Sequence, residues 1–217
     1  MEVPAGPPYF MKAIFCSDLH GNEAYYDRLL SFAKQEMADA IIIGGDLCPH
    51  LKIDIIDAIL GQKQFIEGFL ASFSERCVSK GIALYLIMGN DDFRANYPLL
   101  KKFNNLHNLV KDLGRWNITG YSFVPPHPFL LKDWEKPDFD YLELTEHPRE
   151  VRTAPRELGT IREDLDKLGK LCNPQETIYV MHSPPYSTLL DKTYSGQHVG
   201  SRAQLFEPIT QNNHSKQ

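Results

Sequence analysis

Four short apolar runs in the sequence each end in side chains that commonly bind metal ions. The endings are Asp18-Leu19-His20, Gly45-Asp46, Gly89-Asn90-Asp91 and His182. Carboxylate, imidazole and amide oxygen ligands suit Mn²⁺, Fe, Zn²⁺ or Mg²⁺ better than they suit metals that prefer thiolate. One carboxylate can face two ions, and a pair of ions roughly 3.5–4 Å apart is a common clamp for displacement at phosphorus. The residue types and their order therefore indicate a metal site suited to phosphate esters.

The elements predicted to carry these residues are short apolar strands that alternate with helices. Strands are expected over 12–17, 38–43, 82–88 and 176–181, with a weaker strand at 117–124. Helices are expected after a cap at Asn22 and over about 53–79, 94–105 and 158–172. This alternation indicates an α/β fold with a largely parallel sheet. Because the carboxyl ends of parallel strands share one edge, the four endings are expected to meet in one cleft.

Residues 125–155 differ in composition from the rest of the chain. They are rich in proline and include the aromatic residues Phe129, Trp134, Phe139 and Tyr141. Proline at this density prevents a regular helix, and the aromatic content is high for a free linker. We interpret the segment as an ordered insertion or lid. A surface loop without fixed structure is the alternative.

The ordered motifs resemble those of the calcineurin-like metallophosphoesterase superfamily. The matching pieces are Asp18-x-His20, Gly44-Gly45-Asp46, Gly89-Asn90-Asp91 and an apolar strand that runs into His182. The resemblance covers about residues 11–201, which we take as one domain. It implies an α/β fold of the αββα type, a β-sandwich flanked by helices. Two stretches, Pro125–Pro137 of the insertion and His182-Ser-Pro-Pro185, are similar to a bacterial and archaeal branch of uncertain substrate.

The resemblance also implies a role for each motif residue. Asp18 and His20 would ligate the first of two divalent ions, and Asp46 would bridge both. Asn90 and His182 would ligate the second ion. The implied activity is hydrolysis of a small phosphoester by a hydroxide that bridges the metals. The candidate catalytic residues are then Asp46, Asn90 and Asp91.

One departure from the family pattern concerns the substrate. The family often has His directly after the Asn of its G-N motif, whereas this chain has Asp91. Family members without that His often favour phosphodiesters over monoesters. An ionised Asp91 would repel a phosphate dianion more strongly than a diester monoanion. We therefore expect a phosphodiester to be the better substrate, with a solvated acid or a helix cap as the alternative role for Asp91.

A second departure is the lack of the family's closing G-H-x-H motif. That motif gives one ligand to each metal, so each ion would keep three residues, and the second sheet is expected to be incomplete. Two alternatives to an active enzyme follow. One is a protein-binding scaffold that uses the 125–155 insertion as its contact surface, and the other is a truncated product. His214 is a candidate substitute ligand.

Several further side chains are candidates for contact with the substrate. Arg94 follows the Gly-Asn-Asp-Asp stretch and suits a phosphate oxygen, with a solvated helix residue as the alternative. His198 follows the loop after the last apolar run and is a candidate for lining the site. Three further histidines are weighed in the same way. For His50 the alternative to a place in the cleft is a surface-loop position, and for His127 and His147 the alternative to substrate contact is packing on aromatic neighbours.

Composition limits the kinds of partner. Lys and Arg number 23 and Asp and Glu number 28 in 217 residues, a net charge of −5, so long nucleic acid is not an expected partner. No uncharged apolar run reaches the ~18–20 residues of a membrane span. The four scattered cysteines favour reduced thiols and a cytoplasmic protein. Residues 1–10 are expected to form a flexible lead-in, and residues 202–217 a polar, disordered tail. The oligomeric state is left open.

Overall fold

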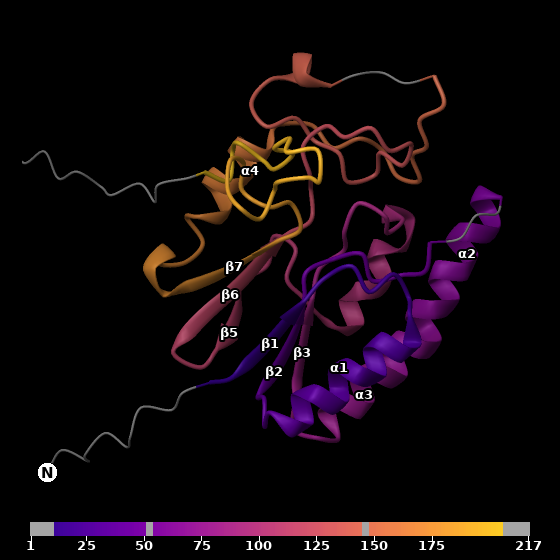
Figure 1. Cartoon of the computed structure of the whole chain (residues 1–217), viewed down its shortest axis with the longest axis vertical. Coiled ribbons are helices and arrows are strands. Elements are labelled where there is room, and N and C mark those ends of the chain that lie inside the picture. The colour runs from indigo at the N-terminus through magenta and orange to yellow at the C-terminus, as the bar shows by residue number, and fades with distance from the viewer. Residues whose placement is uncertain (1–10, 51–53, 145–147, 206–217) are drawn as a thin grey trace, which may run out of the picture.

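Two sheets flanked by helices make up the computed structural model, which describes residues 11–50, 54–144 and 148–205. The first sheet is parallel with strand order β1-β2-β3-β4, and the second has the order β5-β6-β7. Helices α1 and α3 lie along one side of the first sheet, and the second sheet lies on the other side (Figure 1). The predicted lead-in and most of the predicted tail lie outside the described residues.

In the first sheet, strand β2 pairs with β1 on one side and with β3 on the other. The strands of this sheet are β1 Ala13–Cys16, β2 Ala40–Ile43, β3 Ala83–Leu86 and β4 Asn104–Asn105. In β2, Ile41 and Ile43 pack under the helices, whereas Ala40 and Ile42 belong to the core between the two sheets. The run of three isoleucines is therefore buried on both faces, as the sequence predicts.

The helices on the outer face confirm the apolar periodicity in the sequence. Helix α1, Glu23–Gln35, begins where the Asn22 side chain accepts a hydrogen bond from the Tyr25 N–H. The helix predicted over 53–79 comprises α2 Ile55–Phe65, a π-helical turn η1 Ile66–Leu70 and α3 Ala71–Val78, which follow one another without a break. The π-helical turn was not predicted.

The second sheet contains one strand that the sequence analysis placed wrongly. Its strands are β5 Lys111–Leu113, β6 Trp116–Tyr121 and β7 Thr177–Met181. Strand β6 pairs antiparallel with β5 and parallel with β7. The strand that leads to His182 therefore lies in the second sheet and not at the edge of the first. It is only partly buried, with Ile178 40% exposed.

Two predicted helices are shorter or different in type. The segment 94–105 forms a 3-10 helix, η2 Arg94–Lys102, with Pro98 inside it. The predicted helix 158–172 is limited to α4 Ile161–Leu168, because Thr160 and Glu163 form a capping box that starts it. Two further 3-10 turns are η3 Tyr141–Glu143 and η4 Pro174–Glu176. No helix in the described part of the chain is long and apolar enough to span a membrane.

The 125–155 insertion packs onto the loop that follows β3. The indole N–H of Trp134, which is fully buried, donates a hydrogen bond of 2.9 Å to the carbonyl of Asp92. The Asp133 carboxylate accepts a hydrogen bond from the Arg94 N–H at 2.8 Å. Lys132 is buried and pairs with the carboxylate of Glu135. These contacts fix the base of the insertion beside the ends of the first sheet.

Candidate metal centre

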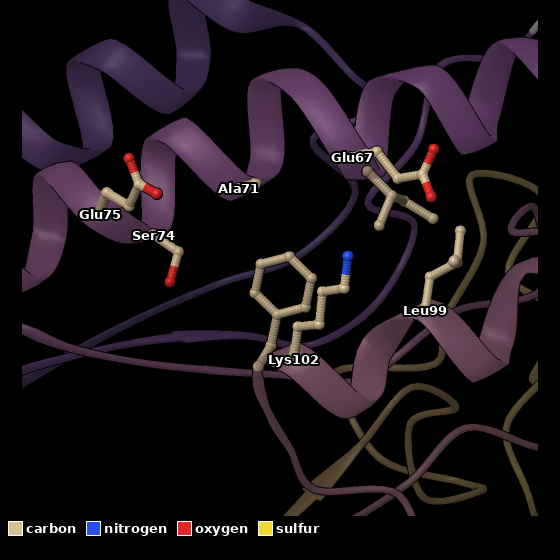
Figure 2. A pocket seen from close by; sticks show the side chains of 8 residues that line it. Glu67, Ala71, Ser74, Glu75, Leu99 and Lys102 are labelled. Carbon is tan, nitrogen blue, oxygen red and sulfur yellow. The ribbon is translucent and has the colours of Figure 1, made fainter.

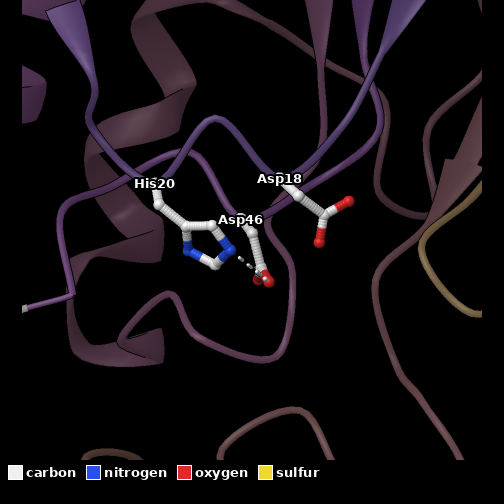
Figure 3. Close-up of side chains that lie close together, drawn as sticks. All are labelled: Asp18, His20 and Asp46. Atoms are coloured by element: carbon white, nitrogen blue, oxygen red, sulfur yellow. Dashed lines mark ion pairs between the residues drawn. The ribbon is translucent and has the colours of Figure 1, made fainter. Parts of the chain in front are cut away.

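Three side chains meet beyond the carboxyl ends of β1 and β2. Asp18, His20 and Asp46 each offer a ligand atom, and these atoms lie within 4.8 Å of one another (Figure 3). His20 Nε2 is 3.7 Å from Asp46 Oδ2. Asp46 is buried, whereas Asp18 and His20 are exposed, so solvent and a substrate can reach one side of the cluster.

A second group of ligand atoms lies around His182, which comes from the second sheet. His182 Nε2 is 3.0 Å from Asn90 Oδ1 and 3.5 Å from Asp46 Oδ1. The other ring nitrogen, Nδ1, lies 2.9 Å from the carbonyl oxygen of Gly44. Because a carbonyl only accepts, Nδ1 carries a hydrogen, and in the neutral ring Nε2 is an acceptor. In that form of the ring, three acceptors would converge, namely His182 Nε2, Asn90 Oδ1 and Asp46 Oδ1, an arrangement that a bound cation stabilises.

Asp46 is the side chain that the two groups share. Its Oδ2 faces His20 and its Oδ1 faces His182, while the N–H of Asp91 donates to Oδ1 at 2.9 Å. Burial raises the pKa of Asp46 to about 6, and the neighbouring His182 only partly offsets this effect. An ionised Asp46 is thus poorly solvated by the protein alone. The donor set and its buried carboxylate fit a divalent metal ion.

The backbone around these ligands adopts a strained conformation. Asp18, His20 and Asp46 all have positive φ, at 59°, 45° and 51°. Left-handed backbone at residues other than glycine costs of order 1 kcal/mol each and is concentrated at functional sites. The loops are held by hydrogen bonds that continue the pairing of β1 and β2, such as His20 N–H to the Asp46 carbonyl at 2.9 Å.

Two glycines permit the close approach of the ligands. A Cβ at Gly45 would lie 2.3 Å from His182 Nδ1. A Cβ at Gly89 would lie 2.2 Å from Asp46 Oδ1 and 2.5 Å from His182 Cε1. A side chain at either position would therefore displace the candidate ligand atoms of Asp46 and His182.

Gly89→Ala is expected to lower the affinity for a divalent ion by about 10–100-fold, the range seen when a ligand loses its positioning. Gly68→Ala is a matched control, because a Cβ at position 68 has no neighbour within 4 Å. Titration of both variants with Mn²⁺, followed by calorimetry, measures the difference. Equal affinities would contradict the close packing of Gly89 against the ligands.

Two buried polar residues that the sequence analysis did not identify hold the loops of the site together. The first, Asp92, is fully buried, and its carboxylate accepts hydrogen bonds from the N–H groups of Leu47, Cys48 and Gly89 at 2.8–3.0 Å. It thereby joins the loop after β2 to the loop after β3. In the sequence, Asp92 is only the second residue of an acidic doublet, and no local pattern distinguishes it from Asp91.

Gln62 makes a second clamp from helix α2. Its Nε2 donates to the carbonyls of Pro49 and Asp91 at 3.3 and 3.0 Å, and its Oε1 accepts the Phe93 N–H at 2.8 Å. Gln62 is buried. The helical periodicity that predicts this helix gives no sign that a polar residue on its inner face serves the site.

Asp91 lies between two histidines. Its Oδ2 is 3.4 Å from His20 Nδ1 and 2.7 Å from His50 Nδ1. Its backbone N–H donates to Asp46 Oδ1. The structure thus places Asp91 beside the ligands, and places His50 in contact with it.

The other predicted substrate residues have partners of their own. The Arg94 guanidinium donates to the Asp133 carbonyl at 3.2 Å and lies over the rings of Phe123 and Trp134. It also pairs with Glu157 at 3.2 Å, so it supports the insertion and is not a solvated helix residue.

His198 and His127 are both held within loops. His198 Nδ1 lies 2.7 Å from a carboxylate oxygen of the buried Asp191. His127 packs against Phe129 with ring centroids 5.3 Å apart, in agreement with the aromatic-packing interpretation. His147 and His214 lie outside the described residues.

A surface pocket elsewhere on the molecule contains none of these residues. It lies between the helical segment η1–α3 and the 3-10 helix η2 (Figure 2). Its lining residues are Ile66, Glu67, Ala71, Ser74, Glu75, Leu99, Lys102 and Phe103. The candidate centre is therefore defined by its ligand atoms and not by this pocket.

The fold and the site together define a class of protein. Two sheets flanked by helices, with carboxylates and imidazoles gathered where the strands end, are the architecture of a metal-dependent phosphoester hydrolase. The model of the calcineurin-like phosphoesterase family matches residues 11–213, and the chain belongs to this family.

Solved structures share the fold at low sequence identity. One crystal structure superposes with a TM-score of 0.55 at 16% identity, and the match covers 88% of this chain and 77% of that one. The crystal structure of TT1561 of Thermus thermophilus superposes with a TM-score of 0.54 at 15% identity, covering 89% of this chain and 75% of that one. These likenesses show the fold alone. No curated protein matches this chain.

Proposed function

We propose that this protein is a dinuclear metal-dependent phosphodiesterase. Asp18, His20 and Asp46 would hold the first ion, and Asp46, Asn90 and His182 would hold the second. The observation that supports a two-ion site is the geometry of Asp46. Each of its two carboxylate oxygens faces a different histidine, which is the arrangement expected of a bridging ligand.

Two divalent ions bound here would activate water at neutral pH and neutralise the charge that develops on the phosphoryl oxygens. The chain's own residues orient the reaction. The Gly44 carbonyl fixes the His182 ring so that Nε2 points at the site. The Asn90 amide presents its oxygen to this group of atoms, which leaves its NH₂ to donate to a phosphate oxygen.

The charge of the site favours a diester. Asp18, Asp46 and Asp91 place three carboxyl groups around the ligand atoms, and only Asp46 among them is buried. A phosphomonoester carries up to two negative charges near pH 7, whereas a diester carries one. The repulsion from a carboxylate that is not neutralised by a metal is therefore smaller for the diester.

The cysteines bear on the compartment. All four are free thiols, and Cys48 and Cys77 are buried. Burial raises the pKa of Cys77 to about 11, which keeps it as an unreactive thiol. Free thiols in these positions agree with a cytoplasmic protein that acts on a small phosphoester.

The test is hydrolysis of bis(4-nitrophenyl) phosphate and of 4-nitrophenyl phosphate by the purified chain. After chelation and readdition of Mn²⁺, we expect turnover only with the metal, and a kcat/KM at least about 10-fold higher for the diester. Activity that survives exhaustive chelation would contradict metal dependence. A higher kcat/KM for the monoester would contradict the diester preference.

One observation favours a second candidate function, a scaffold that binds another protein. The insertion exposes several large apolar side chains, among them Phe129, Leu130 and Leu142, the last 90% exposed. Exposed apolar residues are typical of protein-binding surfaces where they gather into one patch. Absence of turnover in a folded, Mn²⁺-saturated chain would favour this function over hydrolysis.

A further inference from the structure

His50 is held beside the candidate metal centre although it lies outside the predicted ligand set. It is on the loop after β2, and its Nδ1 is 2.7 Å from Asp91 Oδ2. The same oxygen is 3.4 Å from Nδ1 of His20, one of the proposed ligands. Asp91 thus orients two imidazoles. The His20 ring faces Asp46 with its Nε2, whereas the His50 ring is outside the proposed ligand set.

Buried residues hold the loop that carries His50 in place. Asp92 binds the N–H groups of Leu47 and Cys48, two residues of the loop that carries His50. Gln62 binds the carbonyls of Pro49 and Asp91, so it holds the backbone on both sides of the contact. Both clamps are buried. The pairing of His50 with Asp91 therefore follows from two fixed loops.

The free side of the His50 ring is accessible. Its side chain is 58% exposed, whereas that of Asp91 is 21% exposed. With Nδ1 donating to the carboxylate, Nε2 lies on the opposite side of the ring. A proton donor at the open side of a phosphoesterase site has a direct use, because a poor leaving group needs a proton as its bond to phosphorus breaks.

We propose that His50 is a catalytic residue that protonates the leaving-group oxygen, oriented by Asp91. The inference rests on the proposed phosphodiesterase function. As the bond between phosphorus and the leaving oxygen breaks, the Nε2–H proton of the imidazolium passes to that oxygen. The ring becomes neutral and keeps its Nδ1–H on Asp91. Water then returns a proton to Nε2 before the next turnover.

The experiment compares two diesters that differ only in their leaving group, methyl 4-nitrophenyl phosphate and methyl phenyl phosphate. The nitrophenolate leaves readily without a proton, whereas phenol, with a pKa of about 10 like that of Tyr, leaves much better with one. His50→Gln in the full chain with Mn²⁺ is expected to lose about 10²-fold or more in kcat/KM on the phenyl ester. The loss on the nitrophenyl ester is expected to stay below about 3-fold.

Two further measurements separate this role from others. Mn²⁺ affinity should be unchanged in His50→Gln, because the partner of the His50 ring among the described residues is Asp91, which is not one of the proposed ligands. Lys63→Gln, which removes an exposed cation from α2, is the control and should hydrolyse both esters like the unchanged protein.

Each alternative result has a definite meaning. Equal losses on both esters, no loss on either, or a fall in Mn²⁺ affinity would overturn the role of His50 as a proton donor. Failure of the unchanged protein to hydrolyse either ester would overturn the phosphodiesterase function itself. The two failures are therefore distinguishable.

Discussion

Asp46→Asn is expected to reduce metal-dependent phosphodiester hydrolysis by on the order of 10³-fold or more. The substitution removes the negative charge from the one side chain that faces both histidines of the site. Loss of several kcal/mol of metal-dependent stabilisation corresponds to a rate decrease of this size. The measurement is kcat/KM for bis(4-nitrophenyl) phosphate at saturating Mn²⁺. Activity within about 10-fold of the unchanged protein would contradict a bridging role for Asp46.

The loss of activity in Asp46→Asn is expected without unfolding. The pKa of Asp46 predicts whether the substitution raises or lowers the stability of the metal-free protein. Burial raises that pKa to about 6, above its ordinary value of 3.8, so the ionised carboxylate destabilises the metal-free fold. The penalty is fully present above about pH 6 and decreases as the pH falls, until it disappears below about pH 3, where the folded and unfolded forms are both protonated. Metal-free Asp46→Asn should therefore unfold at a higher temperature than the unchanged protein at pH 7.5. The difference in unfolding free energy is on the order of 2 kcal/mol at pH 7.5 and should vanish below about pH 3.

Asp92→Ala is expected to lower the free energy of unfolding by about 3 kcal/mol or more. The change leaves three backbone N–H groups, those of Leu47, Cys48 and Gly89, without their acceptor in the interior. A buried donor without a partner costs about 1–3 kcal/mol. In a domain of this size the melting temperature should fall by roughly 10 °C. Thermal unfolding followed by circular dichroism measures the shift.

The control for this prediction is Asp57→Ala, in the exposed first turn of α2. It removes an acidic residue of the same kind without breaking a buried contact, so its effect should stay within about 0.5 kcal/mol. A similar small effect for Asp92→Ala would mean that the loops after β2 and β3 are held together by other contacts.

The candidate ligand residues could be selected from the sequence because each follows an apolar run, and the structure brings their side chains together. The three longer strands of the first sheet lie close to their predicted positions, since consecutive apolar residues such as Ile41, Ile42 and Ile43 define a strand buried on both faces. The position of β7 could not be predicted in this way. An apolar strand in the second sheet and one in the first have the same local pattern, and only pairing with β6 distinguishes them.

The residues that position the ligands were missed for a related reason. Asp92 and Gln62 act through hydrogen bonds to backbone groups up to 45 residues away in the sequence. No spacing rule connects a carboxylate to the N–H of a distant loop. The start of helix α4 differs from the predicted start at 158 for a local reason, because Thr160 forms a capping box with Glu163, a pattern that is present in the sequence.

Because β7 belongs to the second sheet, the two proposed ion sites depend on different parts of the fold. The first depends on one sheet, and the second depends on both. Asp18, His20 and Asp46 all follow strands of one sheet, so the first site persists as long as that layer does. His182 reaches Asn90 and Asp46 from the opposite layer. Binding of an ion at the second site therefore depends on the relative position of the two sheets. A loosened sandwich would pass through a form with a single ion before it lost both.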